Sequence, residues 1–126
     1  MSEVSENRVW EAIREDNVLD LALGLTEIDD INMCNEDGHT LLVYAVLHNK
    51  PLATELLIGR GADVNLETNS ESNDTPLLAA VTTYNTPIMT MLLDAGASPT
   101  LANSFGETPL RAAAGKVGWE LLLKYE

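Results

Sequence analysis

The segment TPLLAA at residues 75–80 decides how this sequence is organised, because near copies of it stand at regular distances along the chain. TPLRAA begins 33 residues later, at 108–113, and TLLVYA begins 35 residues earlier, at 40–45. A second landmark begins 21 residues after two of the threonines, as GADVN at 61–65 and GASPT at 96–100. Such a period is typical of solenoid proteins, in which each repeat is one small supersecondary unit.

The repeat divides the 126 residues into a single domain of four units, at about 1–34, 35–67, 68–102 and 103–126. A chain of this length is long enough to bury a hydrophobic core. We expect the first and last units to act as caps, because the outer face of an end repeat contacts water.

Each unit is expected to form two helices joined by a turn. Thr40, Thr75 and Thr108 are expected to begin the first helices, because a threonine hydroxyl accepts hydrogen bonds from the free N–H groups there. The prolines after two of these threonines suit the first helical position, where no N–H is needed. Gly61 and Gly96 stand where the second helices must end in a left-handed backbone conformation.

The apolar residues of the repeat predict which side chains are buried. Small alanines at the centre of each first helix let neighbouring units approach closely. The second helices are expected to bury a side that includes Leu56, Leu57, Ile58, Met91, Leu92 and Leu93. We expect Trp10 and Trp119 to pack within the core or caps of the two terminal units.

These motifs resemble the ankyrin repeat, and the resemblance covers nearly the whole chain. It is carried by GHT at 38–40, by the two Thr-Pro-Leu-x-x-Ala segments and by GADVN. It implies an all-α solenoid of about four helix–turn–helix units with β-hairpin-like finger loops. The first unit departs from the pattern, reading VWEAI at 9–13, and the last ends soon after LLL at 121–123.

The charge of the chain excludes several classes of partner. Seven Lys and Arg stand against twenty Asp and Glu, which gives a formal net charge of −13. The stretch from Gly61 to Leu110 carries six acidic residues and no Lys or Arg. Nucleic acids and anionic membrane surfaces would need a basic patch. We therefore expect neither nucleic acid nor a membrane to be the partner.

The sequence also indicates where the protein works. No apolar run approaches the ~18 residues of a membrane span. The acidic beginning lacks the apolar stretch of a secretory signal. Cys34 is the single cysteine and forms no internal disulfide, which favours a reducing compartment. We expect a cytoplasmic protein.

Few residues could carry catalysis or hold a metal ion. Cys34, His39 and His48 fall on separate elements, and the two histidines lack the close spacing of metal ligands. The acidic segment 67–74 lacks the glycine and the spaced bidentate glutamate of a calcium loop. No phosphate-binding loop or nucleophile elbow occurs. We therefore expect a protein without enzymatic activity, metal or cofactor.

The resemblance places the binding surface on the finger tips and on the concave face made by the first helices. Mapping these positions gives the candidate partner-binding residues Glu36, Asp37, His39, Leu47, His48, Glu71, Ser72, Asp74, Thr82, Thr83, Tyr84, Phe105, Glu107 and Lys116, with Arg14 and Glu15 added by the first unit. Tyr84 and Phe105 are aromatic at positions where polar residues would suffice. Each either anchors a partner or serves packing, Tyr84 by covering the edge of the stack and Phe105 by lying under the finger at 67–74, which two extra residues lengthen.

Two functions fit this sequence. The first is an inhibitor or immunity-type protein, monomeric when free, that binds a basic partner protein through its acidic concave and finger face. The alternative is an adaptor or scaffold that recruits a client without inhibiting it.

Overall fold

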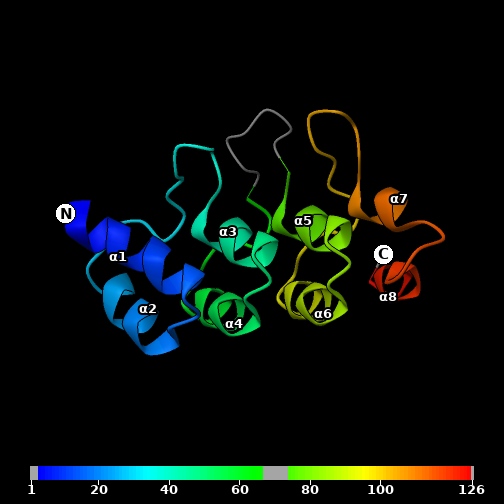
Figure 1. Ribbon diagram of the computed structural model, residues 1–126. Helices are drawn as coiled ribbons and strands as arrows, with labels where there is room; N and C mark the ends of the chain where they lie inside the picture. Colours follow the sequence, from blue (N-terminus) through cyan, green and yellow to red (C-terminus); the bar gives the residue numbers. More distant parts are fainter. Residues whose placement is uncertain (1–2, 67–73, 126) are drawn as a thin grey trace.

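Short helices in two parallel rows form the molecule, with α1, α3, α5 and α7 in one row and α2, α4, α6 and α8 in the other (Figure 1). The computed structural model describes residues 3–66 and 74–125. The helices are α1 (Glu3–Arg14), α2 (Val18–Leu25), α3 (Leu41–Leu47), α4 (Pro51–Gly59), α5 (Pro76–Thr82), α6 (Thr86–Asp94), α7 (Pro109–Ala113) and α8 (Trp119–Leu123).

Successive helices pair within a unit, and the pairs stack side by side. In the first row α3 packs against α1 and α5, and α7 packs against α5. In the second row α4 packs against α2 and α6. Arg8 joins the first pair, because its guanidinium lies 2.6 Å from an Asp20 carboxylate oxygen and 2.9 Å from one of Glu27. The expected all-α solenoid of helix–turn–helix units is confirmed.

The helix starts follow the sequence prediction. The hydroxyls of Thr40, Thr75 and Thr108 each accept a hydrogen bond from the backbone N–H three residues later, at 3.2, 3.3 and 3.1 Å. Pro76 and Pro109 open the helices that follow two of these threonines. These caps satisfy N–H groups that have no partner inside the helix.

Residues with positive backbone φ angles follow both the first and the second helices of the units. Gly61 and Gly96 follow α4 and α6 with φ of +93° and +100°, which confirms their predicted left-handed conformation. In the turn inside each of the first three units, Asp16, Asn49 and Tyr84 have φ of 55–56°. Asn and Asp adopt this conformation readily, whereas a bulky tyrosine is strained in it.

One continuous hydrophobic core runs between the two rows. Its largest fully buried side chains are Ile13, Leu21, Leu41, Leu42, Leu57, Leu77, Leu78, Ile88, Met89, Leu92, Leu122 and Val9. Ala45, Ala80 and Ala113 have no exposed surface, as expected where neighbouring units approach closely. Of the side chains predicted on the second helices, Leu57, Leu92 and Leu93 are buried, and the other three are half-buried.

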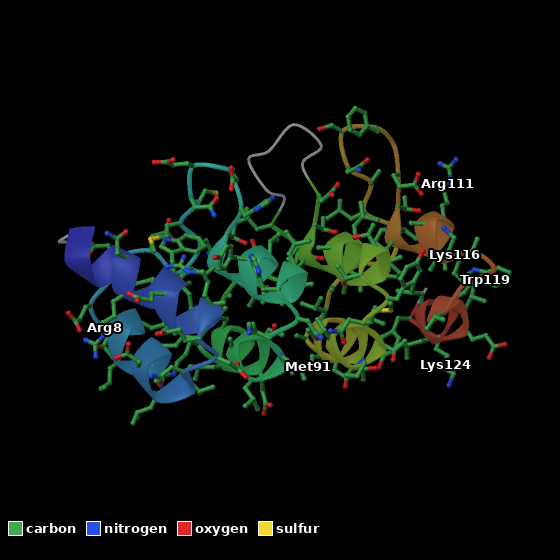
Figure 2. The ribbon with its side chains drawn as sticks, in the orientation of Figure 1. Arg8, Met91, Arg111, Lys116, Trp119 and Lys124 are labelled. Carbon is green, nitrogen blue, oxygen red and sulfur yellow. The ribbon has the colours of Figure 1, made fainter. Side chains whose placement is uncertain are left out.

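The two tryptophans differ in burial. Trp10 is half-buried and packs edge to face against Tyr44, with ring centroids 5.2 Å apart. Trp119 is 38% exposed and does not pack in the hydrophobic core. It is the first residue of α8 and lines an open surface hollow with Lys116 and Lys124 (Figure 2). Val117 is also exposed, so this end of the stack is more apolar than the cap that we expected.

Candidate protein-binding surface

The segments that connect the units extend from the row of first helices. Figure 1 shows the segment before α3 and the segment before α7 rising beyond that row. In the first, an isolated antiparallel bridge joins Cys34 and Thr40. The backbone N–H of Asn35 donates to the carbonyl of His39 at 2.9 Å. These contacts make the segment resemble a short β-hairpin, as expected for a finger loop.

An asparagine side chain holds the tip of this first finger. Asn35 Oδ1 accepts hydrogen bonds from the backbone N–H groups of Asp37 and His39, both at 3.0 Å. Gly38 closes the turn with φ of +81°. The carboxylates of Glu36 and Asp37 are therefore carried on an ordered turn and are exposed.

The finger before α7 uses the same device. Asn103 Oδ1 accepts hydrogen bonds from the N–H groups of Phe105 and Glu107, both at 2.9 Å, and Gly106 has φ of +77°. Sequence reasoning missed this role of the asparagines. The signal was present as Asn-x-x-Gly at 35–38 and again at 103–106.

Some of the predicted finger side chains are exposed, and others are partly buried or bonded within the protein. Phe105 is 72% exposed, and most of the finger under which it could pack lies outside the described residues. Glu107 is exposed and His39 is half-buried. Asp74 is half-buried, and its carboxylate accepts a hydrogen bond from Asn103 Nδ2 at 2.8 Å, so it braces the next finger. The predictions for Glu71 and Ser72 lie outside the described residues.

The predicted residues at the ends of the first helices are all exposed: Leu47, His48, Thr82, Thr83, Tyr84 and Lys116. Tyr84 is 58% exposed and lies in the turn between α5 and α6. Figure 1 shows this turn between the two rows, whereas the segment that carries Phe105 rises beyond the first row. The structure therefore does not bring Tyr84 and Phe105 together.

A groove of about 900 Å³ lies between α1, the first finger and α3. Trp10 and Tyr44 contribute aromatic rings to it, and Glu11, Glu36 and Asp37 contribute carboxylates. Sequence reasoning missed this site. The signal was a bulky Tyr44 in a first helix, at the position where the later repeats carry Ala79 and Ala112.

The rings of the groove form a short ladder along the first helices. Tyr44 stands between Trp10 and His48, and its ring centroid lies 4.2 Å from that of His48. Arg14 Nη1 donates a hydrogen bond to the Tyr44 hydroxyl at 3.3 Å. This hydrogen bond raises the pKa of Arg14 above its ordinary value, so the guanidinium stays charged.

No metal centre is assembled in the part of the chain that the structure describes. Within residues 3–66 and 74–125, no group of three His, Cys, Asp or Glu side chains is arranged to hold an ion. Cys34 and His39 share the first finger, so the expectation that the three residues fall on separate elements is wrong for this pair, and His48 follows α3. Over the same ranges, no helix combines the length and apolar character that spanning a bilayer requires.

Stacked helical pairs with ordered, exposed fingers define a repeat solenoid, a class of protein that presents an extended binding surface. The chain matches the family described as "Ankyrin repeats (3 copies)" over residues 9–103 and again over 42–125. It therefore belongs to the ankyrin-repeat family, whose members are protein–protein interaction modules.

Two curated relatives show the same family in longer chains. The human "Ankyrin repeat and SOCS box protein 6" is 36% identical over 97 residues, which cover 70% of this chain and 23% of that protein. The "Potassium channel AKT2/3" of Arabidopsis thaliana is 34% identical over 109 residues, covering 78% of this chain and 13% of that protein. The chain thus spans less than a quarter of the length of these relatives.

Proposed function

We propose that this ankyrin module binds a basic partner protein through its acidic concave and finger surface, and inhibits that partner by covering a positively charged site. The observation that carries the proposal is the charge of the exposed fingers. Glu36, Asp37, Asp63 and Glu107 are exposed, and no Lys or Arg occurs from Gly61 to Leu110. A surface of one sign steers an oppositely charged partner toward it.

Two aromatic side chains support a role for this surface in binding. Phe105 is held out on an ordered turn, and exposed aromatic residues are enriched among the anchors of protein interfaces. Tyr84 keeps a strained left-handed backbone while its ring stays in solvent. Strain that brings no packing gain points to a functional constraint on the residue.

The proposed role requires neither catalysis nor a cofactor. We infer that it acts without catalysis and without a cofactor, as a monomer when free, in the cytoplasm. His48 follows α3, apart from Cys34 and His39 in the first finger, which supports the first point. The high net negative charge supports the monomer, because copies of the chain repel one another.

A second function is favoured by the relatives. In both, the matched segment is a small part of a much longer protein, as expected for a module that recruits a client for activity located elsewhere. The adaptor and the inhibitor differ in one measurable respect. Saturating a captured enzyme with this module abolishes the enzyme's activity if the module is an inhibitor and leaves it intact if the module is an adaptor.

The binding surface is tested by capturing partners from the source cell and comparing variants by surface plasmon resonance. We expect Phe105→Ala to weaken binding by about 1–3 kcal/mol, mainly through faster dissociation. Glu55→Lys is the control, because Glu55 is exposed on α4 in the second row. If Glu55→Lys abolishes binding and Phe105→Ala has no effect, the partner occupies the opposite face and the proposed surface is wrong.

A further inference from the structure

The groove between α1, the first finger and α3 combines two features that seldom meet on a solvated surface. Its wall carries the rings of Trp10 and Tyr44, and its rim carries the carboxylates of Glu11, Glu36 and Asp37. Aromatic faces attract cations through the ring quadrupole, and carboxylates attract them through charge. Both features therefore favour the same kind of ligand group.

The geometry keeps this arrangement in place before any ligand arrives. Trp10 and Tyr44 pack edge to face with an interplanar angle of 85°, so the two rings brace each other. Asn35 holds the backbone of Asp37 through its side chain, which fixes the position of the acidic tip. A preorganised site loses less conformational entropy when it binds.

The groove already holds one guanidinium of this chain, that of Arg14. This guanidinium donates a hydrogen bond to the Tyr44 hydroxyl. Three carboxylates and one guanidinium line the groove, so its formal charge stays negative. Room for a second guanidinium remains, because the groove measures about 900 Å³ with Arg14 present.

We propose that this groove binds an extended, arginine-bearing segment of the partner, with a guanidinium held against Trp10 and Tyr44 and paired with the carboxylates of the first finger. This inference rests on the proposed function in one respect, that the partner is basic. It adds the location of the cation site and the chemistry that the site selects. Arginine is favoured over lysine because its planar guanidinium both stacks on rings and pairs with carboxylates in a fork.

A short labelled peptide that alternates arginine and glycine is the probe. Its affinity for the whole chain is measured by fluorescence anisotropy at low ionic strength. A peptide with citrulline in place of arginine keeps the shape and loses the charge, and a lysine peptide keeps the charge and loses the planar fork. We expect the affinity to be highest for arginine, lower for lysine and undetectable for citrulline.

Two double variants, each of which removes two negative charges, distinguish binding in the groove from attraction by the overall negative charge. Glu36→Gln with Asp37→Asn removes two charges that line the groove, and Asp63→Asn with Glu107→Gln removes two exposed charges that do not line it. We expect the first pair to weaken binding about tenfold and the second less than about threefold. Equal losses in the two pairs would overturn the groove, because the peptide would then be held only by overall charge.

Two further measurements test the groove without any substitution in the hydrophobic core. Arg14→Gln removes the competing cation from the groove surface and is expected to strengthen arginine-peptide binding about threefold or more. The indole N–H resonance of Trp10 is expected to shift on titration with the arginine peptide, while that of Trp119 stays unchanged. The variant Trp119→Phe assigns the two signals.

The results for the groove and for the proposed function are distinguishable. If the arginine peptide leaves the Trp10 resonance unchanged and Arg14→Gln gives no gain, the groove proposal is wrong. The captured partner can in that case still lose affinity in Phe105→Ala, which would support the wider acidic surface without the groove. If the peptide binds as expected and the captured partner is not basic, the groove stands and the proposed function is wrong.

Discussion

Asn65 Oδ1 accepts a hydrogen bond from the backbone N–H of Ser98 at 2.8 Å, and Asn65 Nδ2 donates to the carbonyl of Gly96 at 3.1 Å. The same link occurs one unit earlier, where Asn32 Oδ1 accepts from the N–H of Asp63 at 2.9 Å. Each asparagine therefore reaches from its own unit to the end of the next one. It gives hydrogen-bond partners to backbone groups in the segment that follows a second helix.

We expect Asn65→Ala to lower the free energy of unfolding by about 1–2 kcal/mol, because two inter-unit hydrogen bonds are lost at a half-buried site. Asn65→Asp is expected to cost less, since it keeps an acceptor for Ser98. Urea denaturation followed by circular dichroism measures both. The control is Glu55→Ala on the exposed side of α4, and a midpoint for Asn65→Ala equal to that control contradicts the role of the link.

Ala80 lies on α5 with no exposed surface. We expect Ala80→Glu to destabilise the fold by about 3 kcal/mol or more, because it buries an unpaired charge and overfills the contact between units. Thr82→Glu places the same side chain at an exposed position of the same helix and should change little. Thermal melting followed at 222 nm compares them. An unchanged melting midpoint in Ala80→Glu would contradict the burial of Ala80 between units.

Gly118 and Gly115 offer a matched pair of substitutions in the last unit. Both have positive φ, at +89° and +72°, so an alanine at either position is strained. A Cβ at Gly118 would also stand 2.7 Å from Met89 Sδ, whereas at Gly115 nothing lies within 4 Å. We expect Gly115→Ala to cost about 1 kcal/mol and Gly118→Ala about 2–3 kcal/mol. Equal costs by chemical denaturation would remove the Met89 contact as a cause.

Tyr84 provides a test of strain against function. We expect Tyr84→Asn to raise the free energy of unfolding by about 0.5–1 kcal/mol, because asparagine tolerates the left-handed backbone at this position. The same variant should bind the captured partner more weakly, because an exposed aromatic contact is lost. Thr83→Asn, one residue earlier and at negative φ, is the control for stability. A Tyr84→Asn variant that gains stability and keeps full affinity would show that Tyr84 does not contribute to partner binding.

The charge of the fingers predicts a salt-dependent association rate. We expect the on-rate for a basic partner to fall as ionic strength rises, because the screening length shortens to about 8 Å near physiological salt. Reversing Asp63 and Glu107 to lysine should lower the on-rate at low salt, whereas Glu55→Lys should change it less. Stopped-flow kinetics measures these rates. An on-rate independent of salt and of these reversals excludes charge steering by the fingers.

Features that act within one unit could be read from the sequence. The threonine caps at Thr40, Thr75 and Thr108 and the glycines Gly61 and Gly96 were predicted, and the structure confirms them. Each depends on a backbone requirement a few residues away, so a local pattern reveals it. Among the candidate site residues, the exposure of those at the helix ends and of Glu36, Asp37, Phe105 and Glu107 followed from the same register, whereas His39 and Asp74 are half-buried.

Features that depend on how units stack could not be read in this way. Asp74 was interpreted as a free surface acid, and its contact with Asn103 joins residues 29 positions apart. Trp119 was expected in the core or cap of its unit, and its partial exposure depends on where α8 lies against the rest of the stack. Tyr84 and Phe105 were both assigned to the binding surface from their positions in the repeat, and the turn and the finger that carry them lie on different edges of the stack.

The sequence by itself therefore determined the family, the period of the repeat, the starts of three first helices, the ends of two second helices and the sign of the overall charge, because these follow from composition and from local backbone chemistry. The tertiary structure decided which side chains meet across units. Trp10 and Tyr44 belong to separate units, and only the stacking of α3 on α1 brings their rings within 5.2 Å and sets them beside the first finger. Side-chain direction on packed helices decides such contacts, and sequence spacing does not record it.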